Sequence, residues 1–344
     1  MGLQSDYLSK VLQPFAKDLA EIERRLTAEC NSSHFEIINE AARRITLDNG
    51  KRLRPVLILE TAKMLGGIQE AHLVFSVIIE LIHTATLVHD DVLDDAFERR
   101  HKMSVNAQWG NETSVMLGDY LFARALTQLS TLASGELLSV VSEATRDLCE
   151  GELIQIQTAR NVHLSPEIYY EIIRRKTASL FAACCYGAAR ISGSSLDVAE
   201  TLRNFGVLIG EAFQIVDDIL DLVGDSSSEG KTLRTDLMNG KMTLPLIHLV
   251  RALEDDEKKM LERVIEGREN AGFLDIQQIL SRGTYLQETY QEVENLCRRS
   301  LDLLLKLPPS VDHELFSAVP EFLVNQARRL VSDSVILKEP ARKS

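Results

Sequence analysis

Apolar residues recur along most of the chain at steps of three and four positions, which is the period of a helix with one buried face. From Leu73 to Val88 this spacing predicts a helix over 73–94, about six turns long. A second such segment covers 202–222, where Gly206 and Gly210 stand one turn apart and permit close helix packing. Alternating β-branched runs are nearly absent, and glycine and proline stand at the edges of the periodic segments. The pattern therefore predicts an all-α fold.

The same periodicity predicts further helices separated by short breaks. They are expected over 7–29, 34–47, 55–65, 113–133, 136–159, 166–192, 242–267, 274–281, 284–306 and 312–333. Breaks such as 49–50, 66–67 and 224–230 are too short to link separate domains. We expect a single domain over 1–344, with an N-terminal helix within 1–30 and a flexible tail over 334–344.

The composition argues against several classes of protein. Lys and Arg number 38 against 51 Asp and Glu, so the net charge of −13 disfavours a phosphate backbone, and no nucleic-acid partner is expected. Five cysteines without a Cys-x-x-Cys pair supply neither a disulfide framework nor a zinc ribbon, which indicates a reduced, cytoplasmic protein. The most apolar stretch, 71–88, carries Glu80 and two histidines and is not expected to span a bilayer.

One five-residue pattern of three aspartates occurs at 90–94 and again at 217–221, each time at the end of an apolar helix. A single cluster is typical of a solvated surface, but two like clusters need a cation to offset their repulsion. Oxygen ligands suit Mg²⁺, which binds through carboxylates together with substrate phosphates, so the expected ligand is a diphosphate bridged by Mg²⁺. On a helix, Asp90 faces the same way as Asp94 and Asp217 the same way as Asp221, whereas Asp91 and Asp218 are rotated by about 100°.

Fixed positive charge for such a ligand stands in compact groups along the same chain. Arg places two donors on phosphate oxygens, whereas Lys acts as a point charge. Any one group is an ordinary surface charge, but their order around the aspartates indicates a built site. The groups are Lys51, Arg52 and Arg54 in 50–55, Arg99 with Arg100, Lys176 beside Thr177, Lys231 and Lys241.

With these motifs, the sequence resembles the trans-isoprenyl diphosphate synthases from Gly50 to beyond Pro245. The resemblance implies the isoprenoid synthase fold, in which long antiparallel helices surround a central cavity. It also implies a homodimer and three Mg²⁺ ions held between the two aspartate motifs and an allylic diphosphate. The metal ligands implied are Asp90, Asp91 and Asp94 of the first motif and Asp217, Asp218 and Asp221 of the second.

The resemblance also assigns two diphosphate sites and the residues next to the reacting carbons. Isopentenyl diphosphate is expected on Lys51, Arg54, His83 and Arg100, and the allylic diphosphate, farnesyl or geranylgeranyl, on Arg99, Lys176, Lys231 and Lys241. Lys176, Thr177, Gln214, Asp90 and Asp217 are the catalytic residues that this predicts, and Gln155 is expected on the cavity wall. At 230–236 the family commonly has glycine where this chain has Arg234, which changes the loop around Lys231.

Product length follows from the residues just before the first motif, where the family controls it. Ala85 and Thr86 are small, so a growing chain can pass them towards Phe75, Phe122 or Phe181 as the floor. This favours a long-chain product, with peripheral membrane contact for its release. A short-chain farnesyl or geranylgeranyl diphosphate synthase is the alternative product class.

Three other readings of the motifs remain open. His89-Asp90 with His83 is similar to the histidine-rich metal site of HD-type phosphohydrolases, although carboxylates outnumber histidines at both clusters. A terpene cyclase would share the Mg²⁺ site but has less use for Lys51, Arg54 and Arg100. A binding subunit of a heteromeric synthase is the non-enzyme alternative, although such a subunit is expected to lose aspartates and none is missing here.

Overall fold

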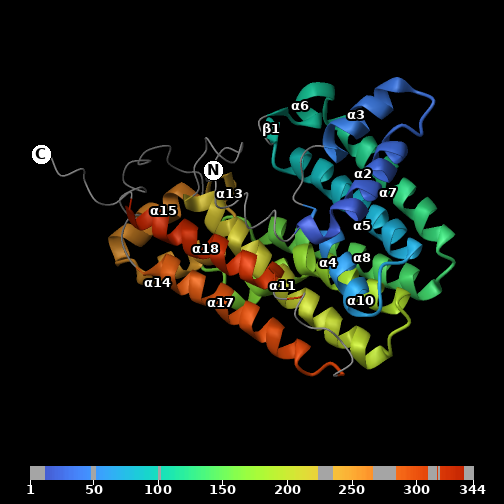
Figure 1. The fold of residues 1–344 in the computed structure, drawn as a ribbon. Helices are drawn as coiled ribbons and strands as arrows, with labels where there is room; N and C mark the ends of the chain where they lie inside the picture. The colour runs from blue at the N-terminus through green and yellow to red at the C-terminus, as the bar shows by residue number, and fades with distance from the viewer. Residues whose placement is uncertain are drawn as a thin grey trace, which may run out of the picture.

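The protein is a bundle of helices (Figure 1). The computed structural model describes residues 12–47, 52–99, 102–223, 235–265, 284–308, 316 and 318–336. Within this part of the chain the only strands are β1 (Glu98–Arg99) and β2 (Lys102–Met103), which pair antiparallel. The predicted all-α class is confirmed.

Most helices follow the predicted order, with shifts of up to about six residues at their ends, and two short helices, 105–109 and 235–238, were not predicted. Those of the first half are η1 (Gln13–Phe15), α2 (Ala16–Cys30), α3 (Glu36–Thr46), α4 (Leu53–Met64), α5 (Glu70–Leu93), α6 (Val105–Trp109), α7 (Asn111–Thr131) and α8 (Gly135–Thr158). Those of the second half are α9 (Pro166–Ile173), η2 (Arg174–Ala178), α10 (Ser179–Ile191), α11 (Leu196–Val223), α13 (Thr235–Met238), α14 (Leu244–Ala252), α15 (Asp255–Ile265), α17 (Tyr285–Leu304) and α18 (Ala318–Ile336). The predicted helix 274–281 lies outside the described residues.

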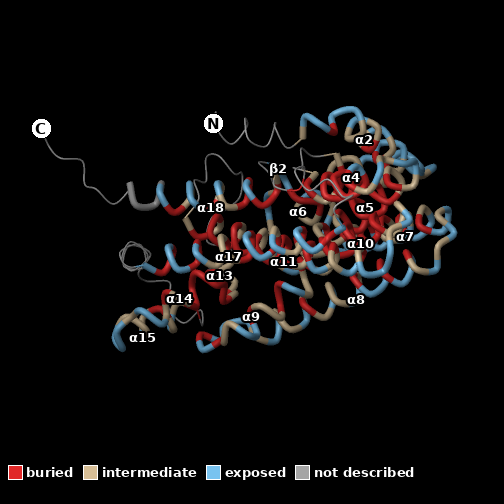
Figure 2. The backbone as a smooth tube through the Cα atoms, turned by 60° about the horizontal axis from the view of Figure 1, so that its bottom comes forward, coloured by how far each residue is buried: buried red, intermediate tan, exposed pale blue. Residues whose placement is uncertain are grey.

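The core gathers where α4, α5 and α10 pack together, and these helices are coloured as buried in Figure 2. α5 has the length and composition of a membrane span, but 67% of its most apolar window is buried inside the bundle. The N-terminal end of α5 is fixed by a capping box between Gln69 and His72. The His72 ring also bonds to the carbonyl of Ala188 at 3.1 Å, which ties α5 to α10.

Two glycines allow α11 to approach α10 and η2 closely, as their spacing predicts. A Cβ on Gly206 would stand 2.6 Å from the carbonyl oxygen of Phe181, and one on Gly210 would stand 2.5 Å from the Cα of Ala178. Real Cβ atoms do not come so near, so any side chain here would push the helices apart.

Two predicted helices are interrupted. The segment 166–192 contains a π-helical stretch, η2, between α9 and α10. The segment 242–267 is two helices, because Leu253 adopts an extended conformation and α15 begins with three acidic residues in its first turn. Negative charge there interacts favourably with the helix dipole and supports a new helix start.

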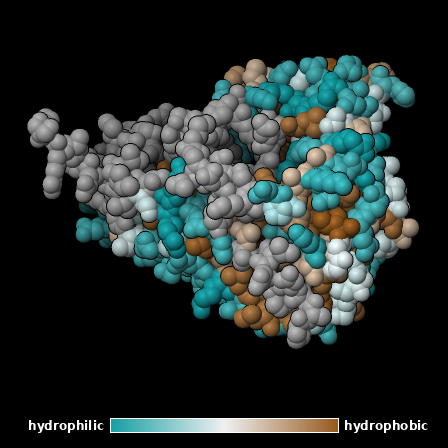
Figure 3. Space-filling model, viewed as in Figure 1, coloured by the Kyte–Doolittle hydropathy of each residue, from teal (hydrophilic) through white to brown (hydrophobic). Residues whose placement is uncertain are grey.

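Hydrophilic side chains cover much of the lobe that contains α2 and α3, with small hydrophobic patches among them (Figure 3).

One carboxyl group lies in the core without a charge partner. Glu60 on α4 is 1% exposed, and its Oε2 atom has no hydrogen-bond partner among the described residues. Burial raises the pKa of Glu60 well above its ordinary value of 4.5. The folded protein therefore binds a proton at Glu60 more tightly than the unfolded chain does.

We expect Glu60→Gln to change how stability depends on pH. Because the folded-state pKa is raised, the wild type loses stability as pH rises above about 4.5, by about 1.4 kcal/mol for each unit of the shift. Gln does not titrate, so the free energy of unfolding of Glu60→Gln should gain on the wild type as pH rises from 4.5 to 8. Urea unfolding at several pH values measures this, and a constant difference between the two proteins would contradict it.

Candidate active site

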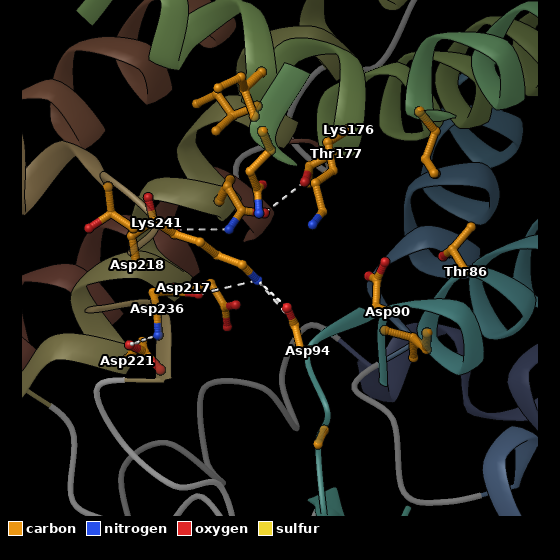
Figure 4. A pocket seen from close by; sticks show the side chains of 18 of the residues that line it. Thr86, Asp90, Asp94, Lys176, Thr177, Asp217, Asp218, Asp221, Asp236 and Lys241 are labelled. Carbon is orange, nitrogen blue, oxygen red and sulfur yellow. Dashed lines mark hydrogen bonds and ion pairs between the residues drawn. The ribbon is translucent and has the colours of Figure 1, made fainter. Parts of the chain in front are cut away.

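The two aspartate motifs face one cavity of about 850 Å³ (Figure 4). Its wall comes mainly from α5, α8, α9 with η2, and α11, and from 236–243. The structure therefore brings together most residues that the sequence predicts for the site. These are Arg54, His83, Thr86, Asp90, Asp91, Asp94, Arg99, Gln155, Lys176, Thr177, Gln214, Asp217, Asp218, Asp221 and Lys241.

Lys241 connects the two halves of the site. Its Nζ atom donates to both carboxylate oxygens of Asp94, at 2.7 and 2.9 Å, and lies 3.7 Å from Asp236 (Figure 4). The first motif is thus bound to a residue far along the chain. An ammonium group stands beside carboxylates that would otherwise repel one another.

A second lysine balances the other end of the first motif. Lys176 forms an ion pair with Glu152 of α8, and its side chain is 19% exposed. Burial lowers the pKa of Lys176, but the carboxylates of Asp90 and Glu152 outweigh this, so the net shift is upward and the amine stays charged. Burial also raises the pKa of Asp90, and Lys176 opposes that shift.

The rotated aspartate of the first motif has a different environment from its neighbours. Asp91 is 1% exposed, and its Oδ1 accepts from Nε and Nη2 of Arg99 at 2.8 and 2.7 Å. Its Oδ2 has no hydrogen-bond partner among the described residues. Arg99 on β1 is thereby fixed at the mouth of the cavity.

The rotated aspartate of the second motif belongs to a chain of hydrogen bonds. Thr177 donates to Oε1 of Gln214 at 2.7 Å, and Nε2 of Gln214 donates to Asp218 at 2.9 Å. The hydroxyl of Tyr169 donates to the other oxygen of Asp218 at 2.6 Å. Burial raises the pKa of Asp218 well above its ordinary range. This chain fixes Thr177 and Gln214 against each other on η2 and α11.

The π-helical stretch η2 places Lys176 and Thr177 on the cavity wall. Such stretches are frequent at functional sites because one extra residue re-aims the side chains of a helix. Gly151 of α8 lies against it: a Cβ at this position would stand 2.5 Å from the backbone nitrogen of Lys176. Gly118 of α7 plays a similar part beside His89, where a Cβ would stand 2.2 Å from Nε2.

Three cavity or near-cavity residues were not singled out as site residues from the sequence. Asp236 lines the cavity, and its backbone N–H donates to Asp221 at 3.2 Å. Tyr169 and Glu152 bond to Asp218 and Lys176 as described above. Asp236 could have been predicted, because it ends the 230–236 segment that was compared with the family pattern. No sequence pattern pointed to Tyr169.

Several predicted residues are not on the described cavity wall. Ala85 and Phe75 lie in the core of the bundle, at 3% and 0% exposure, and Phe75 packs against Gly187. The chain-length assignment of Ala85, Thr86 and Phe75 stays a prediction. Lys51, Arg100, Lys231 and Arg234 lie outside the described residues.

The donor set fits Mg²⁺ bound together with a diphosphate. Carboxylates of both motifs line the cavity, and Asp91 Oδ2 is a buried acceptor without a donor. The described residues hold no ready-made group of three metal-ligating side chains. Mg²⁺ usually binds through one or two carboxylates and completes its shell with phosphate and water.

Comparison with known proteins gives consistent matches over most of the chain. The sequence model of the polyprenyl synthetase family matches residues 35–282. The octaprenyl diphosphate synthase of Escherichia coli is 32% identical over 322 residues, which are 93% of this chain and 99% of that protein. An all-trans-nonaprenyl-diphosphate synthase (geranyl-diphosphate specific) of Rhodobacter capsulatus is 35% identical, covering 89% of this chain and 94% of that protein.

Solved structures agree with these relatives. A decaprenyl diphosphate synthase from Rhodobacter capsulatus superposes with a TM-score of 0.85 at 32% identity, over 94% of this chain and 99% of that one. A polyprenyl synthase from Caulobacter crescentus, complexed with calcium and isoprenyl diphosphate, gives 0.86 at 32% identity, over 93% and 97%.

We expect Gly151→Ala to displace Lys176, because the new methyl group has no room beside η2. Overpacking of this kind costs about 1–3 kcal/mol in the free energy of unfolding. Gly135→Ala at the start of the same helix is the matched control, since nothing lies within 4 Å of its Cβ position. Urea unfolding of both variants measures the cost, and equal stability of the two would contradict the close contact.

Proposed function

This chain belongs to the polyprenyl synthetase family, and we propose that it condenses isopentenyl diphosphate head-to-tail with an allylic diphosphate to make a long-chain all-trans polyprenyl diphosphate. The enzyme is a trans-prenyltransferase, and diphosphate is its second product. Relatives named for octaprenyl and nonaprenyl products match nearly the whole chain. The observation that carries the proposal is the pair of aspartate motifs on α5 and α11 facing one cavity, with Lys176 and Lys241 beside them.

The allylic diphosphate would bind between the motifs. Lys176, Lys241 and Arg99 would supply the positive charge there. Lys231, which the family resemblance assigns to the same diphosphate, lies outside the described residues. In the absence of ligand the three described groups balance carboxylates, and they would turn to phosphate oxygens as the substrate enters. The hard step is loss of the allylic diphosphate, and fixed cations stabilise the charge that develops on it.

Mg²⁺ would be held by Asp90, Asp91 and Asp94 of α5 and its end, and by Asp217, Asp218 and Asp221 of α11, with three ions per site. When bound, the metal supplies Lewis-acid stabilisation of the departing diphosphate. A solved relative contains calcium and isoprenyl diphosphate together, which supports a divalent cation with this ligand class.

The second substrate would lie on the side of Arg54 and His83. The family resemblance assigns Lys51 and Arg100 to the same substrate, and both lie outside the described residues. Thr177 and Gln214, fixed by their hydrogen bond, would contact the reacting carbons between the two substrates. The double bond of isopentenyl diphosphate attacks the allylic cation, and the proton then leaves to the released diphosphate. Apolar wall residues such as Leu180 and Phe213 exclude water from the cation.

A homodimer is the assembly we propose. Exposed apolar side chains on α7 and α8 form a surface suited to a second copy. They are Val115, Met116 and Leu126 of α7, and Leu138, Leu153 and Ile156 of α8. We further propose a cytoplasmic enzyme that touches a membrane peripherally when its insoluble product leaves.

Two alternatives stay within the family. A short-chain synthase would stop at farnesyl or geranylgeranyl diphosphate. The other alternative is a binding subunit of a heteromeric synthase; a 34% identical relative, named heptaprenyl diphosphate synthase component 2 in Geobacillus stearothermophilus, is by its name one component of a synthase. The retained aspartates of both motifs favour the catalytic role for this chain.

Incubation of the purified protein with farnesyl diphosphate, labelled isopentenyl diphosphate and Mg²⁺ tests the proposal. We expect one long polyprenyl product by chromatography and none in EDTA. Asp217→Asn should lower kcat by about 100-fold or more, as loss of a preorganised charge contact does. Asp302→Asn, an exposed carboxylate on α17, is the control. If the protein elongates no allylic primer, the proposal fails and the binding-subunit role is favoured instead.

We expect Ala85→Tyr to shorten the product, because a ring at this position on α5 would block a chain that grows past Thr86 along the helix. Ala85→Ser adds a single atom and should leave the length unchanged. Product sizing by chromatography measures both. If Ala85→Tyr makes the wild-type length at a normal rate, the tunnel does not follow this face of α5.

A further inference from the structure

Arg52, the N-cap residue of α4, and Arg54, in its first turn, have separate surroundings although they are two positions apart. Arg52 adopts a left-handed conformation with φ of 50°, and its side chain is 12% exposed. Its guanidinium donates to Glu80 of α5 at 2.6 Å and to the carbonyl of Thr46 at 2.7 Å. It also donates to both oxygens of Glu23 of α2. Arg52 does not line the cavity.

Arg54, in contrast, borders the cavity. Its guanidinium lies over the ring of Phe181, 4.7 Å from the centroid, and its Nε has no hydrogen-bond partner among the described residues. Burial lowers the pKa of Arg54, and the carboxylate of Glu80 opposes that shift. The cation is thus held at the wall with donor capacity that the protein does not use.

Glu80 therefore acts on both arginines. Its side chain is 4% exposed, and a carboxylate so deeply buried is strongly destabilised unless a cation is bound to it. Arg52 supplies that cation directly. Without Arg52, the guanidinium of Arg54 is the cation whose charge already interacts with Glu80.

We propose that Arg52 is a positioning residue that binds Glu80 and so keeps Arg54 available for the diphosphate of isopentenyl diphosphate. Arg52 acts through Glu80 and does not touch the substrate. The inference rests on the proposed function, because it takes the cavity side of Arg54 to be the isopentenyl diphosphate site. In this proposal Glu80 competes with the substrate diphosphate for Arg54, and Arg52 prevents this by neutralising Glu80.

Arg52→Gln, Glu80→Gln and the double variant test this, with KM measured separately for each substrate. Arg52→Gln should raise KM for isopentenyl diphosphate by about 10- to 100-fold, the loss of a hydrogen bond to a charged group, with KM for farnesyl diphosphate within about twofold. Adding Glu80→Gln removes the competing carboxylate and should restore most of the lost affinity. Glu80→Gln alone should leave KM for isopentenyl diphosphate unchanged or lower it.

An Arg52–Glu80 ion pair with only a structural role would behave differently. Its loss would raise KM for both substrates, or lower kcat, and the double variant would be no better than Arg52→Gln; either result overturns the proposal. If Arg52→Gln does not fold, Glu80→Gln decides alone, because a supporting role of Glu80 for Arg54 would raise KM for isopentenyl diphosphate.

Arg124→Gln is the matched control. Arg124 of α7 bonds Glu29 of α2 at 2.9 and 2.6 Å, so it also binds α2 to a neighbouring helix, but it is not among the residues that line the cavity. Its KM values should equal those of the wild type. If the wild type itself elongates no primer, the proposed function fails, and this result is distinct from the failure of the inference about Arg52.

Discussion

Carboxylates that meet across one cavity repel one another, and two buried or half-buried ammonium groups hold this site together. Lys241 bonds both oxygens of Asp94, and Lys176 stands between Glu152 and Asp90. The carboxylates that repel one another lie close together, but a lysine that neutralises them comes from a distant part of the chain, since Lys241 bonds Asp94. The same lysines that stabilise the ligand-free cavity are the ones that a diphosphate would engage.

The charged groups are held in position because the backbones of several helices pack unusually close together. Gly206 and Gly210 bring α11 against α10 and η2, and Gly151 brings α8 against the backbone of Lys176. Apolar burial along α4, α5 and α10 then fixes the ends of α5 and α11 on opposite sides of the cavity. The geometry of the charged groups is therefore decided by small residues that carry no charge.

Periodicity was sufficient to predict most of the helices, because the rise and the turn per residue are the same in every helix. It also placed Asp91 and Asp218 on rotated positions, and the structure gives both separate partners, Arg99 and Tyr169. What sequence reasoning missed depends on contacts between distant segments. The π-helical stretch, the break at Leu253 and the direction of Arg52 are set by neighbours that no local pattern identifies.

The contact between Gly118 and His89 connects α7 to the first aspartate motif. His89 immediately precedes Asp90, and its ring fills the space above Gly118 on α7, between exposed Val115 and Met116 on one side and α5 on the other. α7 cannot shift towards α5 without moving this ring. A shift of α7 would therefore displace the residue next to Asp90, so the packing of α7 helps to set the position of the first aspartate motif.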